Sequence, residues 1–218
     1  ILFVLKSAAL LGQTYYSKIV PFEVSNPNPI RIIVKDNFIY INSINYINNI
    51  GSSSIIRLDE ENYEPDIYNY EGFAFARNGL YVIDHDFYGF GSNNIIANTV
   101  SFVKFGNDFS IEKQTSFGTP GGKNGVTASE SLNGYIYGVT ADDSYPNGNK
   151  HREVNVKKFD TLGNELWSKN YGQSDNLTYC WEAEASMDDH ILLSTGFHNG
   201  GIFSQLIKID TLGEVVWH

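Results

Sequence analysis

A nine-residue phrase that occurs twice constrains the fold of this chain more than any other feature. Residues 159–167 read FDTLGNELW and residues 209–217 read IDTLGEVVW, with the same Asp, Thr, Leu, Gly and Trp in register. Self-similarity at a fixed period, here about 50 residues, is typical of repeat architectures. The repeat predicts the architecture and leaves the activity open.

The chemistry of the phrase indicates a β-hairpin. The short side chain of Asp160 or Asp210 is suited to accept hydrogen bonds from backbone amides of a turn. Gly163 or Gly213, three residues later, supplies the positive φ that closes such a loop. The tryptophan at the end of each copy then offers a large apolar area on the next strand. Two unrelated hairpins would not share these residues in register.

Weaker copies of the phrase lie upstream, so that hairpins are expected near Leu58, Phe105, Phe159 and Ile209. A second hairpin precedes each of them and has its own turn. The predicted turns of these hairpins are Lys35-Asp36-Asn37, Arg77-Asn78-Gly79, Leu132-Asn133-Gly134 and Met187-Asp188-Asp189. Asn-Gly between alternating apolar residues is the strongest short-range indication of a hairpin. The repeat unit is therefore four antiparallel strands.

Four-stranded units of this size predict an all-β protein, a β-propeller built of four-stranded antiparallel blades. No window after Gly12 keeps the apolar spacing of a helix for three turns, whereas alternation of period two recurs throughout. A β-sandwich with a similar number of strands is the competing fold. We expect about four blades within a propeller domain of residues 14–218, as part of a larger ring. The expected blades are 30–72, 73–118, 124–172 and 181–218.

The first residues are expected to lie outside the propeller. Residues 1–13, ILFVLKSAALLGQ, form an apolar run that is too short for a membrane span and reads as the tail of a truncated signal peptide. The alternative is a buried first strand or helix. Because residues 1–13 read as a signal peptide, the expected location is secreted or at the cell surface.

Residues 14–20 could be an outer strand that closes the ring, because LGQTYYSK resembles LGNELWSK.

Charge and cysteine content exclude several classes of partner. The formal net charge is −10 and no Lys/Arg cluster occurs, which argues against nucleic acid and against anionic membranes. The acidic residues between Asp59 and Glu71 are most simply interpreted as lying on a solvent-exposed outer strand, where charge discourages pairing with other strands. The single cysteine, Cys180, excludes an internal disulfide and is expected to be a small buried apolar residue.

At this point the sequence resembles a known family. The stretch VKKFDTLGNELWSKNYG, the following DHILLSTG and the final QLIKIDTLGEVVWH are similar to bacterial propeller repeats of the SBBP type in the quinoprotein-like superfamily. The resemblance covers residues 150–218 clearly and residues 30–120 faintly. It implies the fold and an exported location, in some relatives with a C-terminal sorting domain. It implies no activity, since one fold hosts many functions.

Candidate ligand-binding residues lie in the loops that join the second and third strands of each unit, expected at 43–53, 85–97, 141–152 and 197–202. Binding residues are often carried by loops on a rigid scaffold, and aromatic, amide and carboxylate groups suit sugars or peptides. Ordinary polar loops are the alternative. The candidate residues are Tyr46, His85, Asp86, Tyr88, Asp142, Asp143, Tyr145, His151 and His198.

Metal and catalytic sites find less support in the sequence. DDSYPNGN at 142–149 lacks the spacing of a calcium loop, and the five histidines lack zinc-binding spacing. Glu182 and Glu184 alternate along a strand and point to the same side, toward a central channel. Paired carboxylates can act on a glycosidic bond, although a water-lined channel has the same pattern. We therefore predict no metal, no cofactor and no assigned catalytic residue.

Two functional hypotheses remain from the sequence. The first is an exported propeller that acts as a binding, adhesion or scaffold module for a glycan or protein at the cell surface. The second is an enzyme, either a quinone-dependent dehydrogenase or a polysaccharide-degrading enzyme. A quinone site needs vicinal cysteines, and Cys180 stands alone. The first hypothesis is favoured, and the sequence leaves the ligand and the oligomeric state open.

Overall fold

The computed structural model describes residues 28–47, 50–59, 64–93, 99–117, 124–144, 151–171, 177–198 and 202–218. These residues form β-strands, turns and short connections and contain no helix, which confirms the predicted all-β class. No helix in this part of the chain could therefore cross a membrane. The proposed signal peptide, 1–13, and the proposed closing strand, 14–20, lie outside the described residues.

The strands form four antiparallel units, which we call blades 1 to 4. Blade 1 contains β1 (Asn28–Lys35), β2 (Phe38–Ile47), β3 (Ile50–Asp59) and β4 (Pro65–Tyr70). Blade 2 contains β5 (Phe73–Ile83), β6 (Asp86–Asn93), β7 (Thr99–Phe105) and β8 (Ile111–Phe117). Blade 3 contains β9 (Asn124–Leu132), β10 (Tyr135–Ser144), β11 (His151–Phe159) and β12 (Glu165–Tyr171). Blade 4 contains β13 (Leu177–Ala185), β14 (Ile191–His198), β15 (Ile202–Ile209) and β16 (Val215–Trp217).

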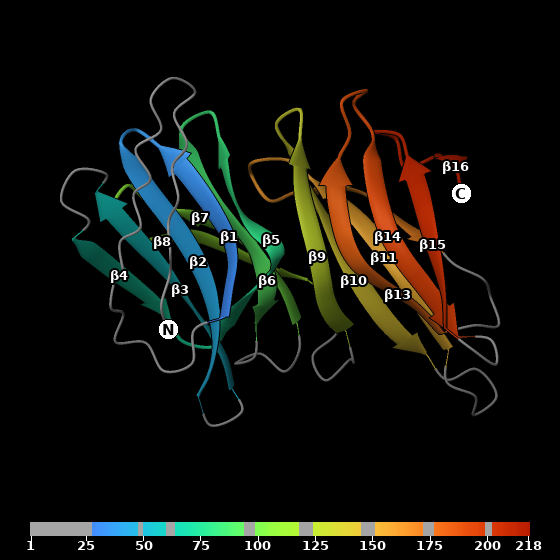
Figure 1. Ribbon diagram of the computed structural model, residues 1–218, viewed down its shortest axis with the longest axis horizontal. Helices are drawn as coiled ribbons and strands as arrows, with labels where there is room; N and C mark the ends of the chain where they lie inside the picture. Colours follow the sequence, from blue (N-terminus) through green and yellow to red (C-terminus); the bar gives the residue numbers. More distant parts are fainter. Residues whose placement is uncertain are drawn as a thin grey trace, which may run out of the picture.

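Successive blades meet through their first strands, with β5 and β9 side by side in the middle of the molecule (Figure 1). Strand β9 also contacts β13, and β1 contacts β5. Only a single parallel bridge joins β5 to β9, at Arg77 and Ala128, whereas the strands inside each blade pair antiparallel along most of their length. This is the blade arrangement of a β-propeller and not the pair of face-packed sheets of a sandwich.

The first hairpin of three blades closes with the same two-residue turn. Both central residues have positive φ in the pairs Asp36–Asn37, Asp84–His85 and Asn133–Gly134. Positive φ at both positions defines the type I′ turn, whose twist matches that of paired strands, and Asn, Asp and Gly tolerate it best. Turn chemistry therefore fixes the register of these hairpins.

The repeated phrase forms the turn between the third and fourth strands, as its chemistry predicts. Asp160 Oδ1 accepts hydrogen bonds from the backbone N–H groups of Leu162, at 2.9 Å, and Asn164, at 2.8 Å. Asp210 Oδ1 accepts the corresponding bonds from the residues two and four positions later. Gly163 and Gly213 have φ values of 75° and 78°. Each aspartate thus satisfies two backbone donors of its own turn.

One turn prediction was wrong. Arg77-Asn78-Gly79 does not end a strand but forms an irregular bulge within β5, where the pairing with β6 shifts between Phe75 and Leu80. Asn78 has a φ of 56°, and a Cβ on Gly79 would lie 2.4 Å from the Phe90 carbonyl oxygen. Asn-Gly supports positive φ in a bulge as well as in a turn. The apolar residues after the bulge continue the strand.

The turn of each later blade docks on the outer strands of the blade before it. The Tyr70 hydroxyl donates to the carbonyl oxygen of Phe109 at 2.8 Å, and the Tyr171 hydroxyl donates to that of Gly213 at 2.8 Å. Between blades 2 and 3, Lys113 Nζ donates to the Leu162 carbonyl oxygen. Apolar side chains between the blades form the core, in clusters that combine residues of neighbouring blades. The same kind of contact therefore recurs between each pair of successive blades.

Candidate ligand-binding site at the axis

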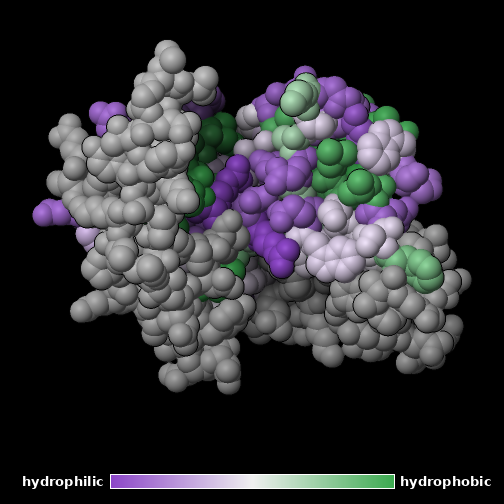
Figure 2. Space-filling model, viewed as in Figure 1, coloured by the Kyte–Doolittle hydropathy of each residue, from purple (hydrophilic) through white to green (hydrophobic). Residues whose placement is uncertain are grey.

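Polar side chains from all four blades meet where the first strands approach one another. We call these residues the axial cluster: Arg31, Arg77, Asn78, Glu130, Glu182 and Glu184. They lie on β1, β5, β9 and β13. Figure 2 shows hydrophilic surface in the middle of the molecule, with apolar patches on either side. The cluster is thus a polar centre within a fold whose blade interfaces are largely apolar.

The bulge in β5 connects the cluster. Asn78 Nδ2 donates to Glu182 Oε1 at 2.9 Å and to Glu184 Oε1 at 3.2 Å. The Asn78 carbonyl oxygen accepts a bond from Arg31 Nη1 at 2.8 Å. Because Asn78 stands in a left-handed backbone conformation, its amide points toward blade 4 while its carbonyl faces blade 1. One residue therefore links blades 1, 2 and 4.

The two arginines of the cluster bind different kinds of partner. Arg31 Nη2 lies 3.7 Å from Glu130 Oε1, and this glutamate is almost fully buried. Arg77 Nη1 instead donates to the carbonyl oxygen of Trp181 at 3.2 Å. Within the described residues, no Lys, Arg or His side chain lies within ion-pair distance of Glu182 or Glu184. Blade 4 thus brings two carboxylates to the axis without a paired cation.

Burial changes the acidity of the cluster. Burial raises the pKa of Glu130, and the Glu184 carboxylate raises it further, while the Ser131 backbone N–H and Arg31 oppose the shift. Burial also raises the pKa of Glu182, again with a contribution from Glu184 and opposition from Arg77. Both shifts have the sign expected when a carboxylate loses water and faces a like charge.

The strand geometry of β13 explains why both glutamates reach the axis. Glu182 pairs with Ser194, Glu184 pairs with Leu192, and the intervening Ala183 is buried in the core between blades 3 and 4. Alternate residues of a strand point to opposite faces. A register shift just before Glu182 moves Trp181 out of this alternation, and its indole lies over Gly196. Trp181 is 38% exposed and borders the cluster.

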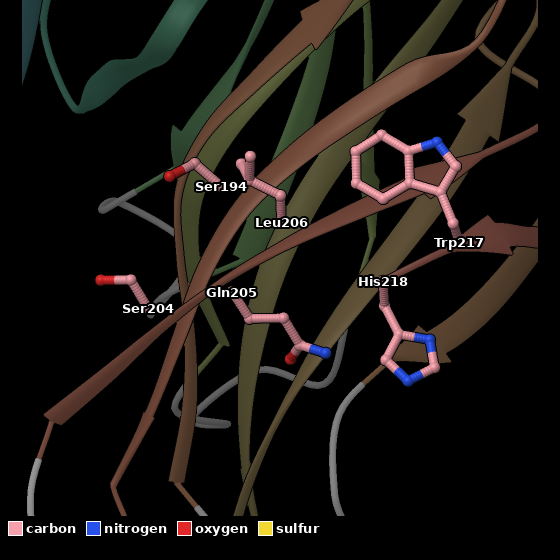
Figure 3. Close-up of a pocket in the computed structure, with 6 residues that line it drawn as sticks. All are labelled: Ser194, Ser204, Gln205, Leu206, Trp217 and His218. Atoms are coloured by element: carbon pink, nitrogen blue, oxygen red, sulfur yellow. The ribbon is translucent and has the colours of Figure 1, made fainter.

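The same face of blade 4 carries an open pocket of about 610 Å³ (Figure 3). Its lining residues are Ser194, Ser204, Gln205, Leu206, Trp217 and His218. Ser194 is the cross-strand partner of both Glu182 and Leu206, so these three side chains form one row across β13, β14 and β15. The pocket is therefore continuous with the axial carboxylates along one sheet face.

The structure does not gather the predicted loop residues at one place. His85 is exposed in the turn between β5 and β6, at the opposite end of the blade from the loops between second and third strands. Asp86 opens β6 and lies 3.0 Å from Lys104 Nζ. Tyr88 is buried and packs against Phe102. Misreading the bulge as a turn displaced this loop in the prediction.

The remaining candidates on described strands lie near the other end of the blades. Tyr46, Asp142 and Asp143, His151 and His198 stand at or near strand ends of β2, β10, β11 and β14, and their side chains lie outside the description. Tyr145 also lies outside the described residues. These positions remain predictions.

Arg31, Arg77, Asn78 and Glu130 were missed as site residues. Each lies on the first strand of its blade, and the alternation of Glu182 and Glu184 was the one sequence pattern that pointed to the axis. Among the described residues no group of three metal-ligating side chains is placed to hold an ion. Cys180 is buried, and burial raises its pKa to about 12, so its thiol is a core group.

Comparisons with known proteins support a shared fold and no activity. No family model matches the sequence, and no curated protein matches it. A hypothetical protein from Leishmania major is 12% identical over 91% of this chain and 74% of its own, with a TM-score of 0.51. An α-L-arabinofuranosidase from Clostridium thermocellum is 14% identical over 84% and 69%, with a TM-score of 0.49. A Pyrococcus horikoshii acylaminoacyl peptidase is 8% identical over 84% and 33%, also at 0.49. Likeness at identities this low concerns the fold alone, and the function rests on the site.

Proposed function

We propose that this protein is an exported binding module that holds a glycan at the axial cluster and the adjoining face of blade 4. The observation that carries the proposal is the continuous surface from Glu184 and Glu182, past Trp181, to the pocket that Trp217 borders. The apolar run at residues 1–13 and the resemblance to SBBP-type repeats support export to the cell surface.

The residue types of this surface suit a sugar. A half-exposed indole such as that of Trp181 offers a flat apolar face for the C–H side of a sugar ring. Carboxylate, amide and hydroxyl groups beside it can hydrogen-bond the ring hydroxyls, as in pockets where a few polar groups fix the orientation of a ligand. Ser194 and Gln205 place such groups farther from the axis.

Calorimetric titration with a panel of neutral and charged oligosaccharides tests this proposal. Trp181→Ala should weaken binding of every oligosaccharide that binds by about tenfold, since stacking area is lost from one end of the surface. Met187→Ala is a matched control, because that side chain is fully exposed in the β13–β14 turn. Binding that is unchanged by Trp181→Ala, or absent throughout the panel, would reject the proposal.

A second candidate is a polysaccharide-degrading enzyme, which one observation favours. The Asn78 amide donates to both Glu182 and Glu184, and burial first and the Glu184 charge second raise the pKa of Glu182. Acid–base cleavage of a glycosidic bond uses a pair of carboxyl groups, one of which has a raised pKa and acts as the acid. Release of reducing ends from a polysaccharide, abolished by Glu182→Gln while binding persists, would establish the enzyme instead.

A further inference from the structure

The charge balance of the axial cluster narrows the ligand class. Glu130 has Arg31 as its counter-ion, whereas Arg77 is committed to a backbone carbonyl. Glu182 and Glu184 each accept a bond from the Asn78 amide through Oε1. Glu182 also accepts one from the Ala183 backbone N–H, and Arg77 and Arg31 act on it only through their charge. Two adjacent carboxylates that repel one another gain from a cation that bridges them, and they gain most where water is partly excluded.

A second feature of the same centre is a buried tyrosine beside these carboxylates. Tyr81 is almost fully buried, and its hydroxyl makes no hydrogen bond within the described residues. The Arg31 guanidinium lies over its ring, 5.2 Å from the ring centroid, and the charges of Glu130 and Glu182 act on its hydroxyl. The Ser129 hydroxyl donates instead to the Arg77 carbonyl oxygen. A buried hydroxyl without a partner costs free energy unless a water or ligand group reaches it.

We propose that the axial cluster binds the protonated amino group of an amino sugar, with Glu182 and Glu184 as its acceptors and Trp181 against the sugar ring. This inference rests on the proposed glycan-binding function and adds the charge of the ligand. An ammonium has three donors and no acceptor, which matches two carboxylates with unused oxygens. The indole of Trp181 favours a cation near its face as well as the apolar side of the ring.

Three oligosaccharides of equal length separate charge from sugar shape. A glucosamine pentamer, its fully N-acetylated form and a glucose pentamer are titrated at pH 6 by calorimetry. The glucosamine pentamer should bind at least about tenfold more tightly than the other two, and this preference should shrink as salt is raised because exposed ion pairs are screened. Acidification should also weaken it, because burial raises the pKa of Glu182 and this acceptor loses its charge as the pH falls.

Conservative variants then identify the acceptors. Glu182→Gln and Glu184→Gln keep an oxygen for the Asn78 amide and should each reduce the preference for glucosamine several-fold. Glu165→Gln is the matched control, because that glutamate pairs with Lys157 on an outer strand and should leave the preference unchanged. Thermal unfolding of each variant confirms that the propeller is intact. A preference that survives the double variant would overturn the inference.

The outcomes keep this inference apart from the function on which it rests. Equal binding of all three pentamers, with loss in Trp181→Ala, would retain the glycan-binding module and reject the ammonium site. Binding of no pentamer would reject both. Tight binding of a lysine-rich peptide that displaces the glucosamine pentamer and does not depend on Trp181 would assign the cluster to a cationic protein segment and overturn the sugar assignment.

Discussion

Blades 3 and 4 carry the same phrase and present it to different surroundings. Trp167 pairs with Lys158 across β11 and β12, and Trp217 pairs with Lys208 across β15 and β16, so the two indoles occupy equivalent positions, as the repeat predicts. Trp167 donates its indole N–H to the Thr211 carbonyl oxygen at 3.2 Å and packs against the core of blades 3 and 4. Trp217 is 44% exposed.

The residues around the two indoles differ in kind. On blade 3 the row inward of the tryptophan pairs Val139 with Val156, and both are fully buried under blade 4. On blade 4 the same row pairs Ser194 with Leu206, and Leu206 is 54% exposed. A face that is to be covered by a blade has apolar pairs, whereas the open face mixes serines with exposed apolar groups. The tryptophan of the repeat is common to both faces, so the neighbouring rows distinguish the face buried under blade 4 from the exposed face of blade 4.

The largest effect expected from this comparison is at the covered tryptophan. Trp167→Ala should lower the free energy of unfolding by about 3 kcal/mol, because packing and one hydrogen bond are lost together. Trp217→Ala should cost less than about 1 kcal/mol, since much of that side chain is already in water. Urea unfolding measures both. Equal losses would show that the two faces are equally covered in solution.

The next largest effect separates two glycines that have similar backbone conformations but different surroundings. Gly163 and Gly134 have φ values of 75° and 77°, but a Cβ on Gly163 would lie 2.8 Å from Phe102 Cδ1, while nothing lies within 4 Å of one on Gly134. Gly134→Ala should cost about 1 kcal/mol through φ alone. Gly163→Ala should cost about 1 kcal/mol more, because the turn also presses on blade 2. A smaller loss at Gly163 would mean that the blade interface adapts.

A hydroxyl deletion measures a single contact of the covered interface. Tyr171→Phe removes the bond to the Gly213 carbonyl oxygen and should cost about 1 kcal/mol. Tyr135→Phe is the control, because that ring is 37% exposed and should change stability little. A Tyr171→Phe protein as stable as the parent would show that water replaces the hydroxyl without loss.

The smallest expected effects are on the pH dependence of stability, and they have opposite signs in two places. The pKa of Glu130 is raised in the folded protein, so its contribution favours folding at low pH and is lost as the pH rises through that pKa. Bonds from Lys208 and Ser186 lower the pKa of Asp188 to about 2, so its contribution is lost as the pH falls. Glu130→Gln should flatten the first dependence and Asp188→Asn the second, in urea unfolding between about pH 2 and about pH 7. Profiles unchanged in both variants would contradict these assignments.

The sequence predicted what depends on local turn chemistry. Asp160 and Gly163 act within a few residues of one another, so their roles follow from spacing alone, and the same holds for Asn133 and Gly134. Asn78 and Gly79 show where that logic fails, because one dipeptide satisfies both a turn and a bulge. A bulge forms here and not a turn because the residues after Gly79 continue to pair with β6.

The axial cluster could be predicted only in part. The alternation of Glu182 and Glu184 fixes a face of one strand, and the sequence identified it. Arg31 and Glu130 carry no such pattern, since a single charged residue in a strand is equally compatible with an exposed edge. Their meeting depends on the curvature that brings four first strands together, which is a property of blade packing and not of any one segment.

The bond between Asn78 and the glutamates of blade 4 joins residues 104 and 106 positions apart, while strand pairing is almost entirely between neighbours in the chain. Each blade can therefore form as its own hairpins emerge during synthesis, with little need for distant segments. The axial centre differs, because Asn78 stands without its carboxylate partners until β13 has been made and placed. A chain interrupted before that strand would keep its earlier blades and lack both carboxylates of blade 4, so synthesis of β13 sets the moment at which the axial cluster is complete.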